Sequence, residues 1–338
     1  MTAAARRNPV ERLIAWALTL KPVRALLLYS EHRGPMLADS VTYRALFSVF
    51  AGVLLGFSLA GLWLAGNPVA WQALVDAVDA AIPGLIGDII DPDTIRAPTG
   101  LTVATVISLV GLIAASIGAI GSLRIAFRTI ADKVHDDVFW VWVLVRNFAL
   151  AAAIGLMLAA SAAAAFFGTA LIGTVQSWLG VGDALSGWAT WGVGLLVTLA
   201  LDTGVVALLF VVLSGVKASA RALWTGAVLG GIALTVLQQL SGLFVGGAAS
   251  NPLLASFASL IALLLWFNLS AQVILIAGAF IITGVREERD GVRARHGAAT
   301  FAQRRLQRAQ DGVRVATEEL RAAEAEAEAE REKRYQDA

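Results

Sequence analysis

Six long apolar runs divide this chain, and each is long enough to cross a membrane as a helix. A helix needs about 20 apolar residues to span the ~30 Å hydrocarbon layer at 1.5 Å per residue. Because 58% of the residues are hydrophobic and only 15% are charged, an ordinary soluble domain is excluded. The pattern predicts an all-α polytopic membrane protein, a bundle of six transmembrane helices. The runs are 42–66, 100–122, 138–167, 187–214, 222–245 and 253–284.

The basic residues lie almost entirely on one side of these runs. Of the 26 Lys and Arg residues, seven occur up to Arg44, four from the end of the second run through Arg146, two between the fourth and fifth runs, and twelve after the sixth. Only Arg96 lies in the other connections. Because basic residues are retained in the cytoplasm, the pattern predicts a multi-pass protein of the cytoplasmic (inner) membrane with both termini cytoplasmic.

Three parts follow from these patterns. Residues 1–41 are expected to form interfacial helices, residues 42–285 the transmembrane domain, and residues 286–338 a charged cytoplasmic helical tail. In the outer loop, apolar residues spaced three and four apart over 67–99 predict an amphipathic helix on the outer membrane surface.

The acidic residues of this outer loop raise the question of a metal site. Carboxylates at Asp88, Asp91 and Asp93 are ligands of the type that hard cations prefer, but their spacing matches no complete metal-binding loop. We favour the alternative, a solvated acidic rim. The chain also has no cysteine, so thiolate ligands are excluded and we expect neither a metal nor a cofactor.

Motifs of enzymes are missing from the sequence. The three histidines, His32, His135 and His296, are scattered over the predicted cytoplasmic segments. No nucleophile elbow, phosphate-binding loop or paired nucleophile and base occurs. We therefore expect a protein that is not an enzyme and does not bind nucleic acid; an enzyme acting on lipid is the third alternative.

Asp202 is the acidic side chain that lies deep within a run. A carboxylate there costs at least ~2.5 kcal/mol on insertion scales, so it needs a proton, a partner or water. It could carry a proton, bind a cation or hold a polar group of a substrate. The structural alternative is a protonated Asp202 that is hydrogen-bonded to a neighbouring helix.

Side-chain amides in the last two runs are the other candidates for a polar path. Gln238 and Gln239 lie in the fifth run, whereas Asn268 and Gln272 share a face of the sixth because they are four residues apart. Such amides either line a substrate or proton path with Asp202 or join helices, at ~0.6 kcal/mol for each hydrogen bond. Adjacent residues point about 100° apart, so one of Gln238 and Gln239 is expected to join helices.

Two further patterns concern the ends and contacts of the helices. Tyr43, Arg44 and Ser48 open the first run and form the predicted cytoplasmic mouth, where Arg44 is expected to snorkel. Small residues four apart predict close helix contacts. These pairs are Gly52/Gly56, Ala114/Gly118, Gly226/Gly230 and Gly242/Gly246.

The charged tail carries a heptad pattern. Alanine, leucine and valine recur at alternating spacings of three and four from Ala299 to Ala327, which predicts a helix over 298–328. Residues 286–314 have eight basic and four acidic side chains, and residues 315–338 have four basic and eight acidic ones. The basic part suits anionic membrane lipids. A solvated helix and a coiled coil, with a second copy or another partner, both remain open.

Several short segments resemble the YihY/BrkB family of inner-membrane proteins, in particular its actinobacterial branch. The resemblance covers residues 33–285 and implies six helices with both ends cytoplasmic. An older name of the family, ribonuclease BN, has no support in these residues. The segments are Arg33–Ala38 followed by Thr42–Ser48, Ser122–Ala126, and Leu263–Trp266 followed by Ala271 and Gln272.

The resemblance also implies a function. Members of this family are described as transporters, some of them linked to export of envelope lipid or to resistance to host killing. The resemblance thus implies a transporter or an envelope lipid exporter; the alternative is a membrane scaffold whose tail recruits a partner. Two positions depart from the family pattern: Ala51 replaces a proline, and Phe280 replaces a glutamate after Gly278 and Ala279. If that glutamate drives transport elsewhere, this chain works differently or has lost the activity.

Overall fold

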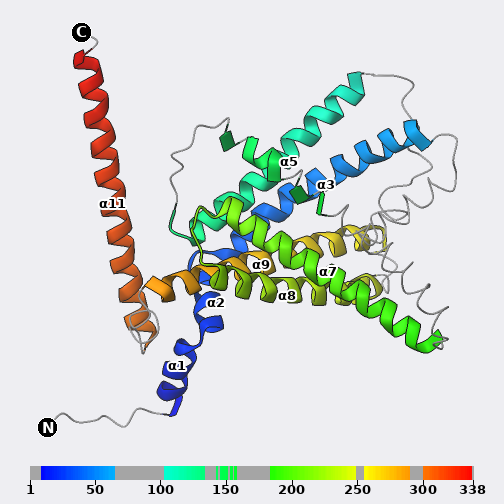
Figure 1. The fold of residues 1–338 in the computed structure, drawn as a ribbon, viewed down its shortest axis with the longest axis horizontal. Helices are drawn as coiled ribbons and strands as arrows, with labels where there is room; N and C mark the ends of the chain where they lie inside the picture. Colours follow the sequence, from blue (N-terminus) through cyan, green and yellow to red (C-terminus); the bar gives the residue numbers. More distant parts are fainter. Residues whose placement is uncertain are drawn as a thin grey trace. The chain divides into compact units, whose positions relative to one another are not determined.

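The computed structural model describes most of the chain. It covers residues 9–64, 103–133, 183–248, 255–289 and 300–336, with short helical pieces between residues 142 and 157. All regular structure in these residues is helical (Figure 1), which confirms the all-α prediction for them. The predicted outer helix at 67–99 lies outside the described residues.

The chain divides into two compact units. The bundle unit comprises Leu28–Ile281, and the terminal unit comprises Met1–Leu27 with Ile282–Ala338. Each is described here by itself.

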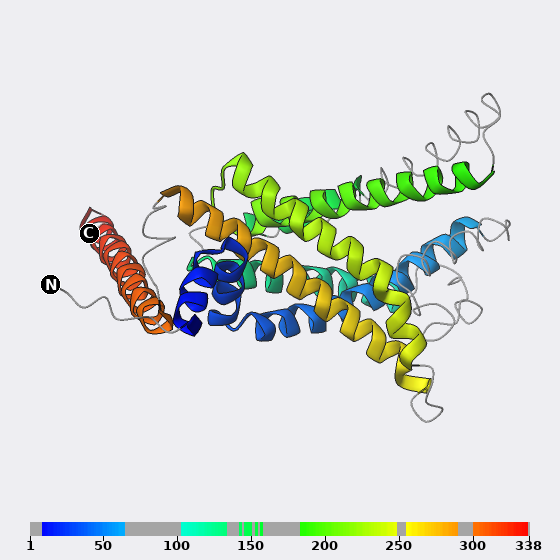
Figure 2. The ribbon, with the colours of Figure 1, turned by 90° about the horizontal axis from the view of Figure 1, so that it is seen from below.

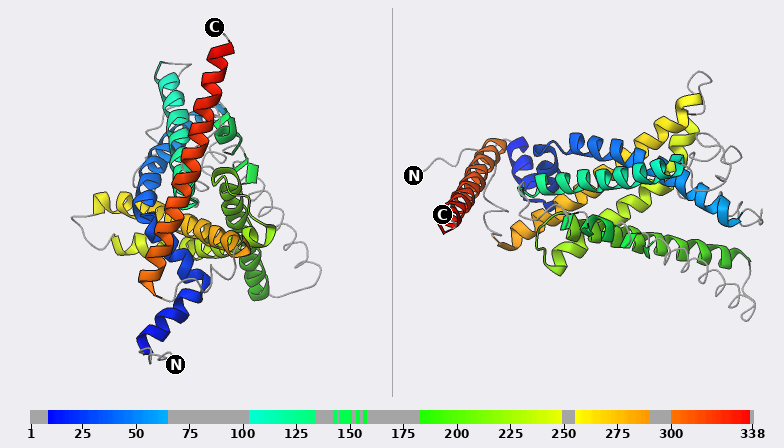
Figure 3. Two further views of the ribbon diagram at one scale, coloured as in Figure 1. Left: turned by 90° about the vertical axis from the view of Figure 1, so that its left-hand side faces the viewer. Right: turned by 90° about the horizontal axis from the view of Figure 1, so that it is seen from above.

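Long helices form the bundle unit, and Figure 2 shows them lengthwise. Helix α3 packs against α5, as Figure 3 also shows, and α7 packs against α8. Their bounds are α3 (Gly34–Leu64), α5 (Val103–Ile130), α7 (Asp183–Leu213), α8 (Ala220–Ala248) and α9 (Ala255–Arg289), of which the part from Ile282 onward belongs to the terminal unit.

Three of the described helices are long and apolar enough to cross a membrane. The stretches that qualify are Trp191–Leu213, Ala220–Leu240 and Leu260–Glu288. The bent pair α1 (Pro9–Thr19) and α2 (Lys21–Glu31) makes a fourth if it is counted as one span. The chain is therefore a membrane protein, whereas the count of six spans stays a prediction because only part of the chain is described.

Two short helices, α1 and α2, are present in the segment where N-terminal helices are predicted. They meet at an angle of 87° around Leu20, so the break precedes Pro22. Pro22 lies in the first turn of α2, where its missing N–H has no intrahelical partner to lose.

A turn at residues 32–33 connects α2 to α3. Arg33 has the left-handed φ of 54° that ends a helix, and a Cβ on Gly34 would lie 2.1 Å from the ring of Tyr29, so glycine is required there. His32 fixes this turn to the end of α5: its Nδ1 lies 2.8 Å from the carbonyl oxygen of Leu28, and its Nε2 lies 2.8 Å from Asp132 Oδ1. The imidazole thus contacts both the end of α2 and the end of α5.

Helix α8 touches its neighbours through glycine, as the Gly226/Gly230 pair predicts. A Cβ on Gly226 would lie 2.3 Å from Ile281 of α9, and a Cβ on Gly230 would lie 2.8 Å from Ala277 of α9 and 3.1 Å from Val206 of α7. As the residue number rises along α8, its contact on α9 moves back from Ile281 to Ala277, so α8 runs antiparallel to α9. The small residues therefore let the backbones approach, as in other membrane bundles.

An apolar cluster fills the space around these contacts. It joins α7, α8 and α9, and its members are less than a tenth exposed. The cluster consists of Val206, Ala207, Ala227, Leu234 and Ala277.

Candidate functional site

Asp202 lies at the centre of an apolar helix. It is eleven residues from each end of the stretch Trp191–Leu213, and it is only 6% exposed. In the three described spans, it is the acidic side chain farthest from an end. The sequence argument for a buried carboxylate thus applies to the folded chain.

Two side chains of α8 hold this carboxylate. Thr235 Oγ1 donates to Asp202 Oδ2 at 3.0 Å, and Gln238 Nε2 donates to both carboxylate oxygens at 3.2 and 3.3 Å. Residues three apart share a helix face, so α8 presents both donors to α7 together. We call Asp202, Thr235 and Gln238 the carboxylate cluster.

A glycine makes this cluster possible. A Cβ on Gly231 would lie 2.2 Å from Thr203 Oγ1, and 2.9 and 3.0 Å from the backbone N and Cα of Thr203. Backbone atoms cannot move aside as a flexible side chain can, so α7 and α8 approach this closely only with glycine at 231. The sequence analysis missed both Gly231 and Thr235. The signal for them was their spacing of four on one face of the fifth run.

Gln239 takes no part in this cluster. It is exposed, whereas the adjacent Gln238 is partly buried against Asp202. The difference follows from the rotation of about 100° between neighbouring residues of a helix.

The two amides of α9 belong to a second cluster. Asn268 Nδ2 donates to Asp39 Oδ1 at 2.7 Å and to Thr42 Oγ1 at 3.4 Å, and Gln272 Nε2 donates to Asn268 Oδ1 at 2.6 Å. We call Asp39, Thr42, Asn268 and Gln272 the amide cluster. Asp39 and Thr42, on α3, were missed because Asp39 precedes the first apolar run; their spacing of three was the available signal.

Asp202 of one cluster and Gln272 of the other lie at about the same level along the bundle unit. Gly230 contacts both Val206 and Ala277, and α7 and α9 both run antiparallel to α8. Asp202 precedes Val206 by four residues, and Gln272 precedes Ala277 by five. At 1.5 Å per residue, Asp202 and Gln272 differ in level by about 1.5 Å. Asn268 lies four residues before Gln272, about 6 Å further along α9. The structure thus places Asp202 with Gln238, and Asn268 with Gln272, in two separate hydrogen-bonded clusters.

The residues of the predicted cytoplasmic mouth lie on α3 beside the amide cluster. Tyr43 is 64% exposed and meets the ring of Phe47 edge to face, with centroids 5.0 Å apart. Arg44 Nη1 donates to the carbonyl oxygen of Gly118 on α5 at 3.4 Å, and Ser48 is partly buried. Arg44 therefore bridges α3 and α5.

With this geometry described, comparison with known proteins gives the family. The profile described as virulence factor BrkB matches residues 25–301 of the chain. The chain belongs to the BrkB family. The match runs from α2 through α9, and no curated protein and no solved structure matches the chain. Its place in the actinobacterial branch stays a prediction.

Within this BrkB chain, Phe280 follows a close contact between α9 and α5. A Cβ on the buried Gly278 would lie 2.3 Å from the ring of Phe127 on α5, and Ala279 is fully buried. Phe127 in turn meets Phe210 of α7 edge to face at 5.9 Å. Phe280 itself is partly buried, so this chain carries a partly buried aromatic residue where the resemblance implies a glutamate.

Basic residues of this BrkB chain gather at the end of α7. Lys133 Nζ donates to the carbonyl oxygen of Gly215 at 3.0 Å, and Arg146 Nη2 donates to that of Val211 at 3.4 Å. Gly215 has the left-handed φ of 66° that is usual after a helix end. These cations donate hydrogen bonds to carbonyl groups at the C-terminal end of α7 and neutralise the negative end of its helix dipole. They therefore help to fix the helix that carries Asp202.

No group of three metal-ligating side chains occurs among the residues that the structure describes. Asp88, Asp91 and Asp93, considered above as cation ligands, lie outside those residues.

Proposed function

We propose that this BrkB-family protein is a transporter of the cytoplasmic membrane that exports an envelope lipid, and that Asp202 is its proton-binding residue. The observation that carries the proposal is a carboxylate at the centre of an apolar span, only 6% exposed. Such residues are costly in membrane helices, and they commonly mark ion or substrate paths.

The contacts of Asp202 support a proton rather than a cation as its counter-charge. Its partners are the hydroxyl of Thr235 and the amide of Gln238, and no Lys or Arg pairs with it in the described part of the chain. Both partners donate, so they stabilise the ionised carboxylate; a proton would neutralise the charge and weaken the link between α7 and α8. Proton binding would thereby bias how closely the two helices pack.

The amide cluster supports a lipid rather than a small buried solute. Its Gln272 lies at about the level of Asp202, and its Asp39 is exposed, as is the neighbouring Tyr43. Polar side chains that open to the side of a bundle suit a headgroup whose acyl chains stay in the bilayer. The proposal includes no enzymatic step.

The test is lipid movement in vesicles. Purified protein in liposomes with a trace of fluorescent phosphatidylglycerol and an imposed pH gradient should speed the transfer of label between leaflets, measured by dithionite bleaching. Gln239→Ala, which changes an exposed residue, should match the parent. A parent protein that moves neither lipid nor protons, the latter followed with an enclosed pH dye, would contradict the proposal.

One observation favours a second function. The large apolar residues of the C-terminal helix are exposed, as expected if that helix recruits a partner to a membrane scaffold. Deleting residues 298–338 separates the two functions, because an exporter should keep its lipid movement without the tail, whereas a scaffold would lose its partner.

A further inference from the structure

Helix α11 (Phe301–Gln336) is a long helix with its own start signal. Thr300 caps it, since Gln303 N–H donates to Thr300 Oγ1 at 3.2 Å and Arg304 N–H to the Thr300 carbonyl at 3.0 Å. The helix confirms the predicted one and extends it to residue 336. The BrkB match ends at residue 301, so α11 lies almost entirely beyond it.

One face of α11 carries exposed apolar residues at heptad spacing. Leu306, Val313 and Leu320 follow one another at intervals of seven and are 60%, 68% and 58% exposed. They occupy the a positions of the heptad, and alanines occupy the d positions. These alanines, which are also exposed, are Ala302, Ala309, Ala316 and Ala323.

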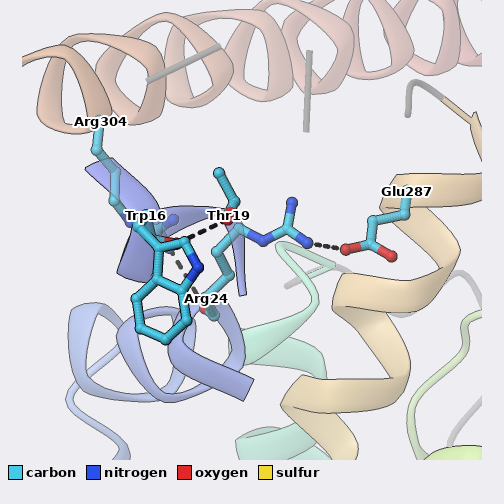
Figure 4. A network of polar contacts seen from close by, with 5 residues as sticks. All are labelled: Trp16, Thr19, Arg24, Glu287 and Arg304. Carbon is cyan, nitrogen blue, oxygen red and sulfur yellow. Dashed lines mark hydrogen bonds and ion pairs between the residues drawn. The ribbon is translucent and has the colours of Figure 1, made fainter. Parts of the chain in front are cut away.

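The attachment of α11 within the terminal unit uses another face. Arg304 Nη2 donates to the carbonyl oxygen of Arg24 at 3.4 Å, and Arg24 itself forms a buried ion pair with Glu287 (Figure 4). Arg304 occupies an f position, opposite the a and d positions. This contact therefore holds the first turn of α11 and leaves the apolar face open.

Charge along α11 favours one direction of pairing. Residues 301–314 have four basic and one acidic side chain, whereas residues 315–336 have four basic and seven acidic ones. Two parallel copies would place like halves together, and two antiparallel copies would place opposite halves together.

The sizes of the core residues favour the same direction. In an antiparallel pair, an a residue of one helix faces a d residue of the other, so each leucine or valine would face an alanine. In a parallel pair, each a residue faces an a residue and each d residue faces a d residue. Core layers with two large residues would then alternate with core layers of two alanines. Facing large with small residues fills space evenly and lets the helices approach.

We propose that α11 pairs antiparallel with α11 of a second copy of this chain, through the face formed by Leu306, Val313 and Leu320. A twofold axis along the membrane normal relates the copies, so the paired helices lie along the membrane surface. The family match does not include this pairing element, and the pairing is independent of the proposed lipid export.

The test uses the absence of native cysteine. Copies of the full chain with different tags, one carrying Ala302→Cys and the other Ala323→Cys, are expressed together and treated with a short bismaleimide. Antiparallel pairing predicts a cross-link between the copy with Ala302→Cys and the copy with Ala323→Cys. It predicts no cross-link between two copies that carry the same substitution. Identical sites would be separated by 17 or more residues along the helix, about 25 Å or more at 1.5 Å per residue.

Two further variants keep the outcome decisive. Val313→Lys should abolish the mixed link, and Asp311→Lys, on the f face, should retain it. Links only between identical copies would mean parallel pairing, and no link at all would mean that water, a membrane surface or another protein covers the face. Either result would overturn the proposal.

Discussion

The carboxylate cluster and the amide cluster lie in the same bundle unit, yet they differ in access. Asp202 is buried at 6% exposure, and glycine at 231 brings its two donors close. In the amide cluster Asn268 and Gln272 are partly buried, but their partner Asp39 is exposed. A carboxylate that is buried between two helices depends on those helices for its hydrogen bonds. An exposed polar group can instead bind water, lipid headgroups or a substrate. The two clusters therefore suit a proton and a headgroup, respectively.

The largest expected effect concerns topology, because the membrane depth of both clusters depends on whether the helices cross the membrane as predicted. Reporter fusions at residues 85 and 181 should read as external, and fusions at residues 135 and 330 as internal. The result is all-or-none at each site. An external C-terminus would contradict the predicted topology, and with it the side of the membrane that each cluster faces.

The next effect sharpens the difference in packing between the clusters. Gly231→Ala should destabilise the protein by roughly 1–3 kcal/mol, because the new Cβ meets the backbone of Thr203. Thermal unfolding in detergent measures the change. Gly194→Ala, on α7 with no atom within 4 Å of the new Cβ, is the matched control and should be neutral. Equal stability of the two variants would show that α7 and α8 are not closely packed at Asp202.

A smaller effect is expected when the carboxylate itself is replaced. Asp202→Leu leaves the hydroxyl of Thr235 and the amide of Gln238 without an acceptor, but it also removes the cost of a buried acid. We expect a net loss of about 1 kcal/mol in the free energy of unfolding. Asp202→Asn keeps an acceptor oxygen, so its free energy of unfolding should equal that of the parent. A Leu variant as stable as the Asn variant would mean that the two hydrogen bonds contribute nothing.

The smallest effect belongs to the open cluster. Asn268→Ala should lower stability by only about 0.6 kcal/mol, since water or lipid headgroups can replace its contact with the exposed Asp39. Denaturation in the same detergent gives the value. A loss as large as that of Gly231→Ala would show that the amide cluster is as closed as the carboxylate cluster.

The sequence predicted the parts of this arrangement that depend on composition and period. Asp202 stood out because a charge in an apolar run is costly, and α11 because its heptad pattern is long. For Thr235 the spacing from Gly231 is a weak signal, since a threonine in an apolar helix also bonds its own backbone, and only the pairing of α7 with α8 brings it to Asp202. Asp39 likewise resembles an ordinary surface residue until α3 meets α9. Partners across helices depend on register and depth, which periodicity within one helix does not specify.

The most direct test of the account compares lipid transfer by Asp202→Asn with that by the parent, in liposomes with a pH gradient. The substitution keeps the size and an acceptor oxygen of the side chain but removes its titration. The account predicts a variant that inserts and unfolds like the parent and yet loses lipid transfer, while Gln239→Ala retains it. Full transfer by Asp202→Asn would contradict the proton-binding role and would leave the amide cluster as the remaining polar path.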